Sequence, residues 1–323
     1  MEWAEGPVRV QVPATSANLG PGFDTLGLAL GLHDVVEARV TGSGLDIEVS
    51  GEGTGEVADA GEKHLVVRAM RVAFDDLNVA QPPGLAVRCV NRIPHGRGLG
   101  SSAAAIVAGL ITARALAGAS TRPEDVLPLA NVLEGHPDNV APCLFGGLTI
   151  AWVAAGPAGA DGPGEVRAIR LDPDPAVRPV AFIAPGPVST KVARGLLPAS
   201  VSHADAARNA GRAALLIAAL TAPLTARADA LLDGTEDKLH QDYRAPAMPH
   251  SHDLVGRLRA AGVPAVMSGA GPSVLAFLTA APAPDEVKRL DSIAVETGID
   301  WHISPLVVER RGASVTPGVR SVR

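Results

Sequence analysis

The chain has few cysteines, no long apolar run and no excess of basic residues, and each lack excludes a class of protein. Only Cys89 and Cys143 are present, both in apolar surroundings, so we expect two buried thiols in a reducing cytosol rather than a disulfide or redox pair. Gly, Arg or Pro interrupts every apolar stretch before membrane-spanning length, so no transmembrane helix is expected. The formal net charge of −6 gives no electrostatic reason to expect nucleic acid as a partner.

What the chain does contain is a globular composition, long enough for more than one core. Of its 323 residues, 47% are hydrophobic and 19% are charged, which excludes a disordered chain. This length exceeds one ordinary compact core and suggests two domains. The first residues, MEWAEGPVRVQVPA, carry acids where a secretory signal needs a basic and then an apolar region, so we expect a cytoplasmic location.

Residue patterning predicts a mixture of strands and helices. Alternating apolar and polar residues indicate strands, and apolar residues three and four apart indicate helices. The expected strands cover residues 7–12, 33–50, 85–93, 148–153, 166–171, 180–183, 265–268 and 274–278. The expected helices cover residues 64–77, 101–117, 123–133, 208–220 and 252–261. The two kinds of element do not alternate regularly, which favours an α+β fold over a doubly wound sheet.

The run Asp172-Pro173-Asp174-Pro175 is the best candidate for a domain boundary, because two prolines and two aspartates rarely continue a helix or strand. It divides the chain into an N-terminal domain of residues 1–175 and a C-terminal domain of residues 176–323. A second irregular run, GPAGADGPG at residues 156–164, is expected to be the exposed loop of a hairpin.

The strongest chemical signal is a glycine-rich loop between an expected strand and an expected helix, Pro94-His95-Gly96-Arg97-Gly98-Leu99-Gly100-Ser101-Ser102-Ala103-Ala104. Glycines let backbone amides approach a ligand closely, and the following helix offers unpaired N–H groups and the positive end of its dipole. Together they predict a phosphate site. The Gly-Lys-Ser/Thr ending of a Walker A loop is missing. By itself, the loop could also be a plain helix cap.

A second glycine-rich run, Asn18-Leu19-Gly20-Pro21-Gly22-Phe23-Asp24, lies near the N-terminus. Its Asn and Asp side chains are suited to holding an amino group, a hydroxyl or a ribose. The same residue types also form turns in Gly-Pro loops without any ligand, so the run alone leaves both interpretations open.

The third run is Glu134-Gly135-His136-Pro137-Asp138-Asn139-Val140-Ala141-Pro142. A carboxylate at the end of a helix, followed closely by His, Asp and Asn, makes a dense polar cluster beside apolar strands. The spacing fits no zinc pattern, whereas a Glu is the hard oxygen ligand that Mg²⁺ prefers. A solvated helix end is the competing interpretation.

The fourth run, Ser268-Gly269-Ala270-Gly271-Pro272-Ser273, is a tight glycine turn between two expected strands. It could be a simple hairpin. Its glycines would also let it pack directly against the backbone of another loop.

Taken together, the glycine-serine loop, the Asn18–Asp24 run and the Ser268–Ser273 turn resemble, in order and spacing, the three motifs of the GHMP kinases. The Glu134–Pro142 run and the N-terminal sequence are similar in particular to the homoserine kinase branch of that family. The resemblance covers residues 8–278. It implies a two-domain α+β fold, with an N-terminal ribosomal-protein-S5-like domain that contains a left-handed βαβ unit and a ferredoxin-like C-terminal domain. It also suggests a homodimer.

The resemblance implies an ATP site with Mg²⁺. The residues that would bind ATP are Pro94, Gly96, Arg97, Gly98, Leu99, Gly100, Ser101, Ser102, Ala103 and Ala104. Glu134 and a serine of the loop would hold the metal, and we predict that this serine is Ser101. Many family members have several more residues between that glutamate and the following histidine. Here only Gly135 separates them, so the Glu134 assignment requires a deletion at this point.

The resemblance further implies that the second substrate is L-homoserine. Its predicted binding residues are Asn18, Asp24, His136, Asn139, Thr190, Arg194 and Arg244, with Thr190 and Arg194 matching a family Thr-x-x-x-Arg pattern. The chemistry agrees, because two arginines can clamp a carboxylate and Asp24 can pair with an ammonium group. The predicted catalytic residues are Asn139, Asp138 and Asp24. Some GHMP kinases use an Asp as base on the acceptor hydroxyl, and either Asp138 or Asn139 could point inward. We expect Asn139 to orient the acceptor hydroxyl, with Asp138 as its support.

Other functions remain open at this stage. A kinase for another small alcohol, such as mevalonate, would have no use for Asp24, because mevalonate lacks an ammonium group. A non-catalytic homologue would be expected to lose the glycine-serine loop or Glu134, and both are present. A dehydrogenase is disfavoured by the missing acidic ribose contact about 20 residues beyond the loop.

Overall fold

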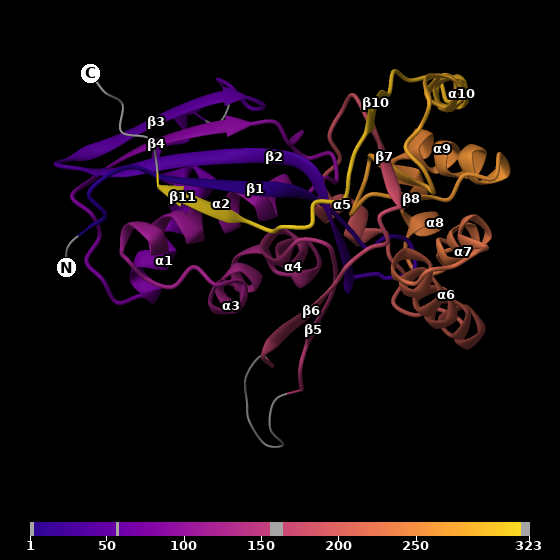
Figure 1. The fold of residues 1–323 in the computed structure, drawn as a ribbon, viewed down its shortest axis with the longest axis horizontal. Coiled ribbons are helices and arrows are strands. Elements are labelled where there is room, and N and C mark those ends of the chain that lie inside the picture. Colours follow the sequence, from indigo (N-terminus) through magenta and orange to yellow (C-terminus); the bar gives the residue numbers. More distant parts are fainter. Residues whose placement is uncertain (1–2, 56–57, 156–163, 318–323) are drawn as a thin grey trace.

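The structure is a computed structural model that describes residues 3–55, 58–155 and 164–317. Within these residues the strands form two sheets, and helices lie between and beside them (Figure 1). The expected α+β composition is confirmed. The 175/176 domain boundary stays a prediction, although the strands do change from the first sheet to the second between residues 171 and 178.

The described part of the first sheet has seven strands. Its main path runs β11-β1-β2-β4-β3, and β5 pairs with β2 and with β6. β2 pairs with β4 along its second half and with β5 along its first three residues. The strands are β1 (Val8–Ala17), β2 (Leu26–Thr41), β3 (Gly44–Gly51), β4 (Gly84–Asn91), β5 (Leu148–Val153), β6 (Val166–Leu171) and β11 (Ser314–Pro317).

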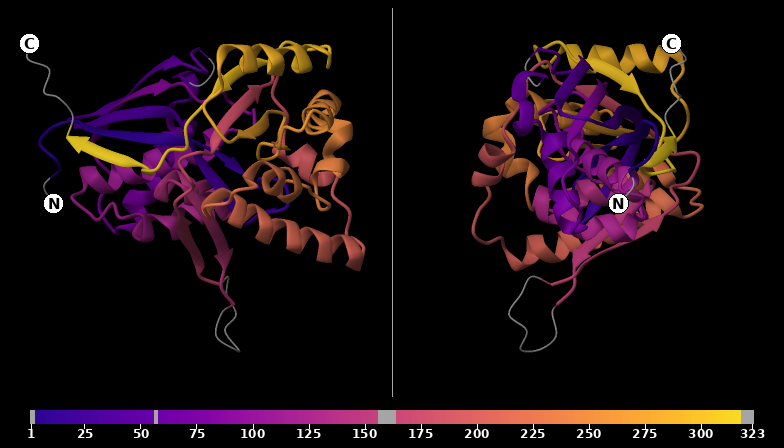
Figure 2. Two further views of the ribbon diagram at one scale, coloured as in Figure 1. Left: turned by 45° about the vertical axis from the view of Figure 1, so that its right-hand side comes forward. Right: turned by 90° about the vertical axis from the view of Figure 1, so that its left-hand side faces the viewer.

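Four helices cover one face of this sheet: α1 (Leu65–Asp76), α2 (Ser101–Leu116), α3 (Pro123–Glu134) and α4 (Pro137–Phe145) (Figure 1). A short 3₁₀ helix, η1 (Ala58–Lys63), precedes α1. The parallel strands β3 and β4 are joined through α1, which makes a βαβ crossover. β5 and β6 form a hairpin that projects from the body of the molecule (Figure 2).

α2 is buried almost all round because its small residues let its neighbours approach closely. Twelve of its residues are buried, many of them alanines. A Cβ on Gly109 would lie 2.4 Å from the backbone oxygen of Val66 and 2.7 Å from Cβ of Ala69, both in α1. The glycine therefore lets α1 approach the middle of α2 closely, backbone against backbone.

The second sheet, over the described residues, has the order β10-β7-β9-β8, and every pairing is antiparallel. This spatial order, with helices between β7 and β8 and again between β9 and β10, is that of the expected ferredoxin-like domain. Its strands are β7 (Arg178–Ile183), β8 (Ala265–Met267), β9 (Val274–Leu278) and β10 (His302–Pro305). Its helices are α5 (Thr190–Gly195), α6 (His203–Thr221), α7 (Arg227–Gly234), α8 (Gln241–Arg244), η2 (Ala245–Ala247), α9 (Pro249–Ala260) and α10 (Pro284–Val295).

One apolar cluster reaches both sheets, and a second, separate cluster lies within the C-terminal half. The main apolar cluster runs from the first sheet and its helices to Ile183, Leu220 and Phe277 of the second half. Arg227 is buried and donates to the carbonyl oxygens of Ala219 and Ala222 and to the carboxylate of Asp174. This ion pair fastens the segment between the sheets to α6 and α7.

Several expected elements are confirmed and others are not. The strands at 148–153 and 166–171 have the expected bounds, and the helices at 64–77, 101–117 and 123–133 are present within a few residues. The single strand expected at 33–50 is wrong: β2 ends at Thr41 and β3 begins at Gly44, whose backbone φ of +79° suits the tight turn between them. Most of the loop expected at 156–164 lies outside the described residues.

Candidate active site

Three loops meet where the two sheets face each other. They are the β1–β2 loop at residues 18–25, the glycine-serine loop before α2, and the β8–β9 turn at residues 268–273. The N–H of Thr15 donates to the carbonyl oxygen of Leu99 at 3.1 Å, and the N–H of Gly269 donates to that of Ala17 at 3.1 Å. These bonds hold together three segments that lie far apart in the sequence.

Gly98 shows why the glycine-serine loop needs glycine. Its φ is +74°, and an added Cβ would lie 2.2 Å from the backbone oxygen of Ser268 and 2.8 Å from that of Gly271. The hydroxyl of Ser268 also lies 2.6 Å from the carbonyl oxygen of Gly98, to which it can donate. The suggestion that the Ser268–Ser273 turn packs against the backbone of another loop is therefore confirmed.

A polar cavity of about 150 Å³ opens at this junction. Residues from both halves of the chain line it, and most of the predicted site residues are among them. Its lining consists of Asn18, Gly96, Gly98, Gly100, Ser101, Ser102, Glu134, His136, Asp138, Asn139, Val188, Thr190, Arg194, Arg244, Gly269, Ala270 and Gly271.

One wall of the cavity is the N-terminal end of α2. Gly100 caps the helix with a φ of +73°, and the first helical residues are Ser101 and Ser102. The hydroxyl of Ser102 donates to the carboxylate of Glu134 at 2.8 Å. Burial raises the pKa of Glu134, and the bond from Ser102 partly offsets this effect. The wall thus combines unpaired backbone N–H groups with a hard oxygen ligand.

A second wall comes from the start of α4. Asn139 accepts a hydrogen bond from the hydroxyl of Thr15 at 2.9 Å. Nδ1 of His136 lies 2.7 Å from a carboxylate oxygen of the buried Asp138, so Nδ1 donates and Nε2 is left as the other polar atom of the ring. The bond to Asp138 raises the pKa of His136, although burial opposes it.

The third wall carries two arginines. Arg194, half-exposed at the end of α5, donates to both carboxylate oxygens of Asp24 at 2.8 and 2.9 Å. This pairing raises the pKa of Arg194. Arg244 differs, because it is 1% exposed and, among the described residues, no carboxylate lies within ion-pairing distance of it.

Neutral groups hold Arg244 in place. Its Nη1 lies 3.1 Å from Nδ1 of His240 and 3.3 Å from the carbonyl oxygen of Gly269, and its Nε is buried without a hydrogen-bond partner in the described structure. Nε2 of His240 faces the carbonyl oxygen of Gly20 at 2.9 Å, so Nε2 carries the proton and Nδ1 accepts. Burial lowers the pKa of His240, which favours this neutral form.

Asn18 fastens the β1–β2 loop. Its side-chain amide donates to the carbonyl oxygen of Gly269 at 2.9 Å, and its side-chain oxygen accepts from the N–H of Asp24. Asn18, Leu19 and Asp24 all have positive φ, a conformation that L-residues rarely adopt. Strain of this kind is typical of a loop whose surroundings hold it in one functional shape.

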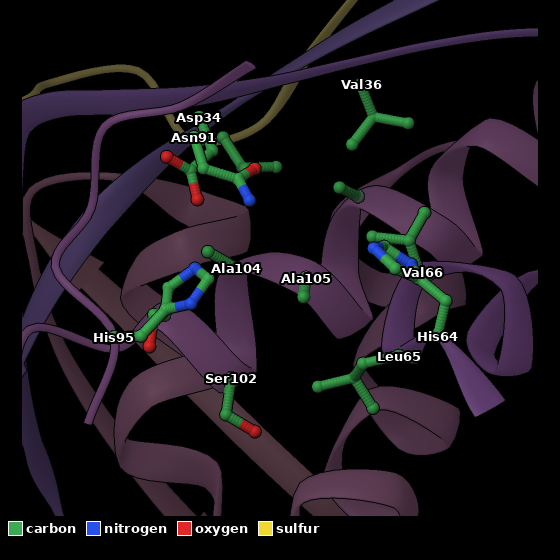
Figure 3. Close-up of a pocket in the computed structure, with 13 residues that line it drawn as sticks. Asp34, Val36, His64, Leu65, Val66, Asn91, His95, Ser102, Ala104 and Ala105 are labelled. Carbon is green, nitrogen blue, oxygen red and sulfur yellow. The ribbon is translucent and has the colours of Figure 1, made fainter. Parts of the chain in front are cut away.

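A second cavity, of about 220 Å³, lies on the other side of Ser101 and Ser102. Its lining is largely apolar, with a few polar side chains, including Asp34, Asn91 and His95 (Figure 3). His64 is 6% exposed, and its Nδ1 has no hydrogen-bond partner among the described residues. Burial and the nearby His95 lower the pKa of His64. This nitrogen is therefore available to hydrogen-bond to a ligand in the cavity.

Some predicted ATP-binding residues line neither cavity. Arg97 turns toward the end of β7, where it donates to the carbonyl oxygens of Ala184 and Pro185. Leu99 and Ala103 are core residues and Pro94 is buried, so these side chains pack inside the protein and anchor the loop. Ala104 lines the second cavity.

The sequence interpretation missed Phe23, His64 and His240. Phe23 lies in a glycine- and proline-rich loop, where an aromatic residue is unusual. Its presence there was the only hint in the sequence that it has a role. His64 precedes a helix but makes no side-chain cap. His240 contacts Arg244 within its own segment, but its contacts with Gly20 and Phe23 span more than 200 positions.

Comparisons with known proteins agree with this arrangement. The model of the GHMP kinases N terminal domain matches residues 64–147, and that of the GHMP kinases C terminal matches residues 216–292. The homoserine kinase of Streptomyces coelicolor is 55% identical over 96% of this chain and 94% of its own length. The homoserine kinase of Mycolicibacterium vanbaalenii is 47% identical over 90% of this chain and 93% of its own length.

Solved structures show the same fold. The homoserine kinase from Cytophaga hutchinsonii superposes with a TM-score of 0.79 at 26% identity, over 98% of this chain and 99% of that one. Phosphomevalonate kinase from Streptococcus pneumoniae, at 11% identity over 93% of this chain and all of that one, has a TM-score of 0.66 and shares the fold alone. The family expected from the four motifs is confirmed, and the chain belongs to the homoserine kinase family of the GHMP kinases.

Proposed function

We propose that the protein transfers the γ-phosphate of ATP to the side-chain hydroxyl of L-homoserine, giving O-phospho-L-homoserine. The observation that carries this proposal is Arg244, a buried guanidinium with no carboxylate partner in the described structure, in the same cavity as the N-terminus of α2. A buried charge is costly unless it is paired. The cavity therefore calls for an anionic group beside a phosphate site.

The charges on the third wall match an amino acid. Arg244 and Arg194 would bind the α-carboxylate, and Asp24 would bind the α-ammonium group. In the structure Asp24 and Arg194 pair with each other. A zwitterion that binds both Asp24 and Arg194 leaves neither charge unpaired, whereas an anion that draws Arg194 away leaves Asp24 without a partner. Thr190, at the start of α5, and Asn18 would supply neutral hydrogen bonds to the same ligand.

The nucleotide would lie across the N-terminus of α2. Its phosphates would face the N–H groups of residues 98–102, where the helix dipole favours negative charge. The apolar second cavity shares Ser101 and Ser102 with the first, so it is placed to receive the base. The unpaired Nδ1 of His64 would then hydrogen-bond to an edge of the purine.

The donor set suits Mg²⁺, which takes one or two carboxylates together with phosphate oxygens and water. Glu134 would hold the ion, whose charge would neutralise the phosphates. Ser102, bonded to Glu134, is the serine closest to that role in this geometry. Ser101, the serine named from the sequence, lines the same cavity, and its place in the metal shell stays a prediction.

Phosphoryl transfer depends mainly on positioning and on neutralising charge. Asn139, fixed by the hydroxyl of Thr15, would orient the acceptor hydroxyl of homoserine toward the phosphate. Asp138 would act through His136, whose orientation and protonation it controls. A mevalonate-type acceptor is disfavoured, because its carboxylate would draw Arg194 away from Asp24 and it has no ammonium group to take the place of Arg194.

The homodimer and the cytoplasmic location stay predictions from the sequence. In the described part of the chain, no helix is both long and apolar enough to cross a membrane. Cys89 and Cys143 are buried and free, and burial raises the pKa of both thiols, that of Cys89 to about 12. A raised pKa keeps a thiol protonated and so disfavours its reaction as a nucleophile.

The substrate assignment is tested by an ADP-release assay with L-homoserine, L-threonine, L-serine and mevalonate, with phosphorus NMR to identify the product. We expect the highest kcat/KM with L-homoserine, because it alone combines both charges with a hydroxyl of the right reach. A higher kcat/KM with mevalonate or threonine would overturn the assignment.

The metal site is tested with Glu134→Gln, Ser102→Ala and, as the matched control, Ser101→Ala. Loss of a group that stabilises the transferring phosphoryl should lower kcat on the order of 10²-fold for Glu134→Gln. Ser102→Ala should raise the Mg²⁺ concentration needed for half-maximal rate more than Ser101→Ala does. The reverse order of the two serine variants would assign the metal to Ser101.

The roles of the second wall, at the start of α4, are tested with Asn139→Ala and Asp138→Asn. Asn139→Ala should lower kcat on the order of 10²-fold through loss of orientation. Asp138→Asn removes the carboxylate charge that raises the pKa of His136 and leaves the opposing effect of burial. His136 should then lose its proton at a lower pH than in the wild type, which NMR titration measures. If Asp138→Asn instead abolished activity in a folded, ATP-binding protein and erased an acidic limb of the pH–rate profile, Asp138 would be a general base.

A further inference from the structure

The half-buried ring of Phe23 contacts both arginines of the third wall. Cζ of Arg244 lies 5.4 Å from the ring centroid, and Cζ of Arg194 lies 5.7 Å from it. The imidazole of His240 stacks on the same ring, with centroids 5.2 Å apart and planes 28° from parallel. Phe23 is thus the one side chain in the described structure shown to contact Arg194, Arg244 and His240 together.

This shared contact answers an electrostatic problem. Arg194 and Arg244 both line one cavity, and the charge of Arg194 adds to burial in lowering the pKa of Arg244. Two cations that point into one cavity repel each other. Asp24 neutralises Arg194 but forms no ion pair with Arg244 in the described structure. The negative face of an aromatic ring attracts a guanidinium at these distances.

We propose that Phe23 is a positioning residue. Its ring holds the guanidiniums of Arg194 and Arg244 in place so that both can bind the α-carboxylate of the substrate. This inference rests on the proposed function, because the carboxylate is that of homoserine. When the ammonium group of the substrate takes Asp24, Arg194 loses its ion pair but keeps its contact with the ring. His240 stacks on the ring, and its hydrogen bond to the carbonyl oxygen of Gly20 holds it against the β1–β2 loop, which carries Phe23.

The test compares Phe23→Leu with Phe23→Tyr, which keeps the aromatic ring and places its hydroxyl at a half-buried position. The two ligands are L-homoserine and L-homoserinol, which carries a CH₂OH group in place of the carboxylate. Phe23→Leu should raise the Kd of homoserine by about 10-fold, equivalent to about 1.4 kcal/mol. The Kd values of homoserinol and of ATP should change less than about 2-fold, within the scatter of distant, independent substitutions. Phe23→Tyr should bind homoserine as the wild type does.

A second measurement needs no substrate. In the ligand-free protein the ring should shift the arginine side-chain N–H resonances of Arg194 and Arg244, and Phe23→Leu should remove both shifts. Arg97, which is bound to backbone carbonyls, serves as the control whose signal stays unchanged.

The outcomes separate cleanly. Equal losses for homoserine and homoserinol, or an unchanged affinity for homoserine, would mean that Phe23 only packs the loop. Unchanged arginine resonances in Phe23→Leu would overturn the ring contact itself. A wild-type protein that binds ATP but neither homoserine nor homoserinol would refute the proposed substrate, and the NMR result would then decide the role of the ring by itself.

Discussion

The active site depends on direct contact between the backbones of three loops. Gly98 lies so close to the carbonyl oxygens of Ser268 and Gly271 that a Cβ would not fit, and Ser268 closes the contact with its hydroxyl. Because the turn belongs to the second sheet and Gly98 to the first domain, this contact sets how the halves face each other. The N-terminus of α2, where we propose that phosphate binds, and the arginines of the second half therefore open into one cavity.

The charges in that cavity are arranged for a ligand rather than for stability. Arg227, also buried, has a carboxylate partner and two carbonyl acceptors. Arg244 has an imidazole, a carbonyl oxygen and an aromatic ring, all uncharged. A buried cation in such surroundings costs free energy until an anion arrives, which is a common compromise at functional sites.

Much of this arrangement could be predicted from the sequence, and the failures have physical causes. The hairpin at 148–171 and the small-residue helix at 101–117 follow from local pattern, and the four motifs led to most of the lining residues. α4 was missed because it begins at Pro137 and contains Pro142, whose missing N–H frees the carbonyl of Asp138 beside Gly27. β11 pairs with β1 across about 300 residues, and no local pattern encodes such pairing. Phe23 and His240 likewise act through distant contacts.

The central claim is that Arg244 is kept unpaired for a substrate carboxylate, and thermal unfolding of Arg244→Met with and without L-homoserine tests it most directly. A buried charge without an ionic partner is costly, so we expect its replacement by an apolar side chain of similar size to cost no stability. We therefore predict that ligand-free Arg244→Met melts no lower than the wild type and gains no stability from homoserine. Arg227→Met, the control, should melt lower and keep the stabilisation by homoserine. An Arg244→Met protein that melted as low as Arg227→Met and was still stabilised by homoserine would contradict the account.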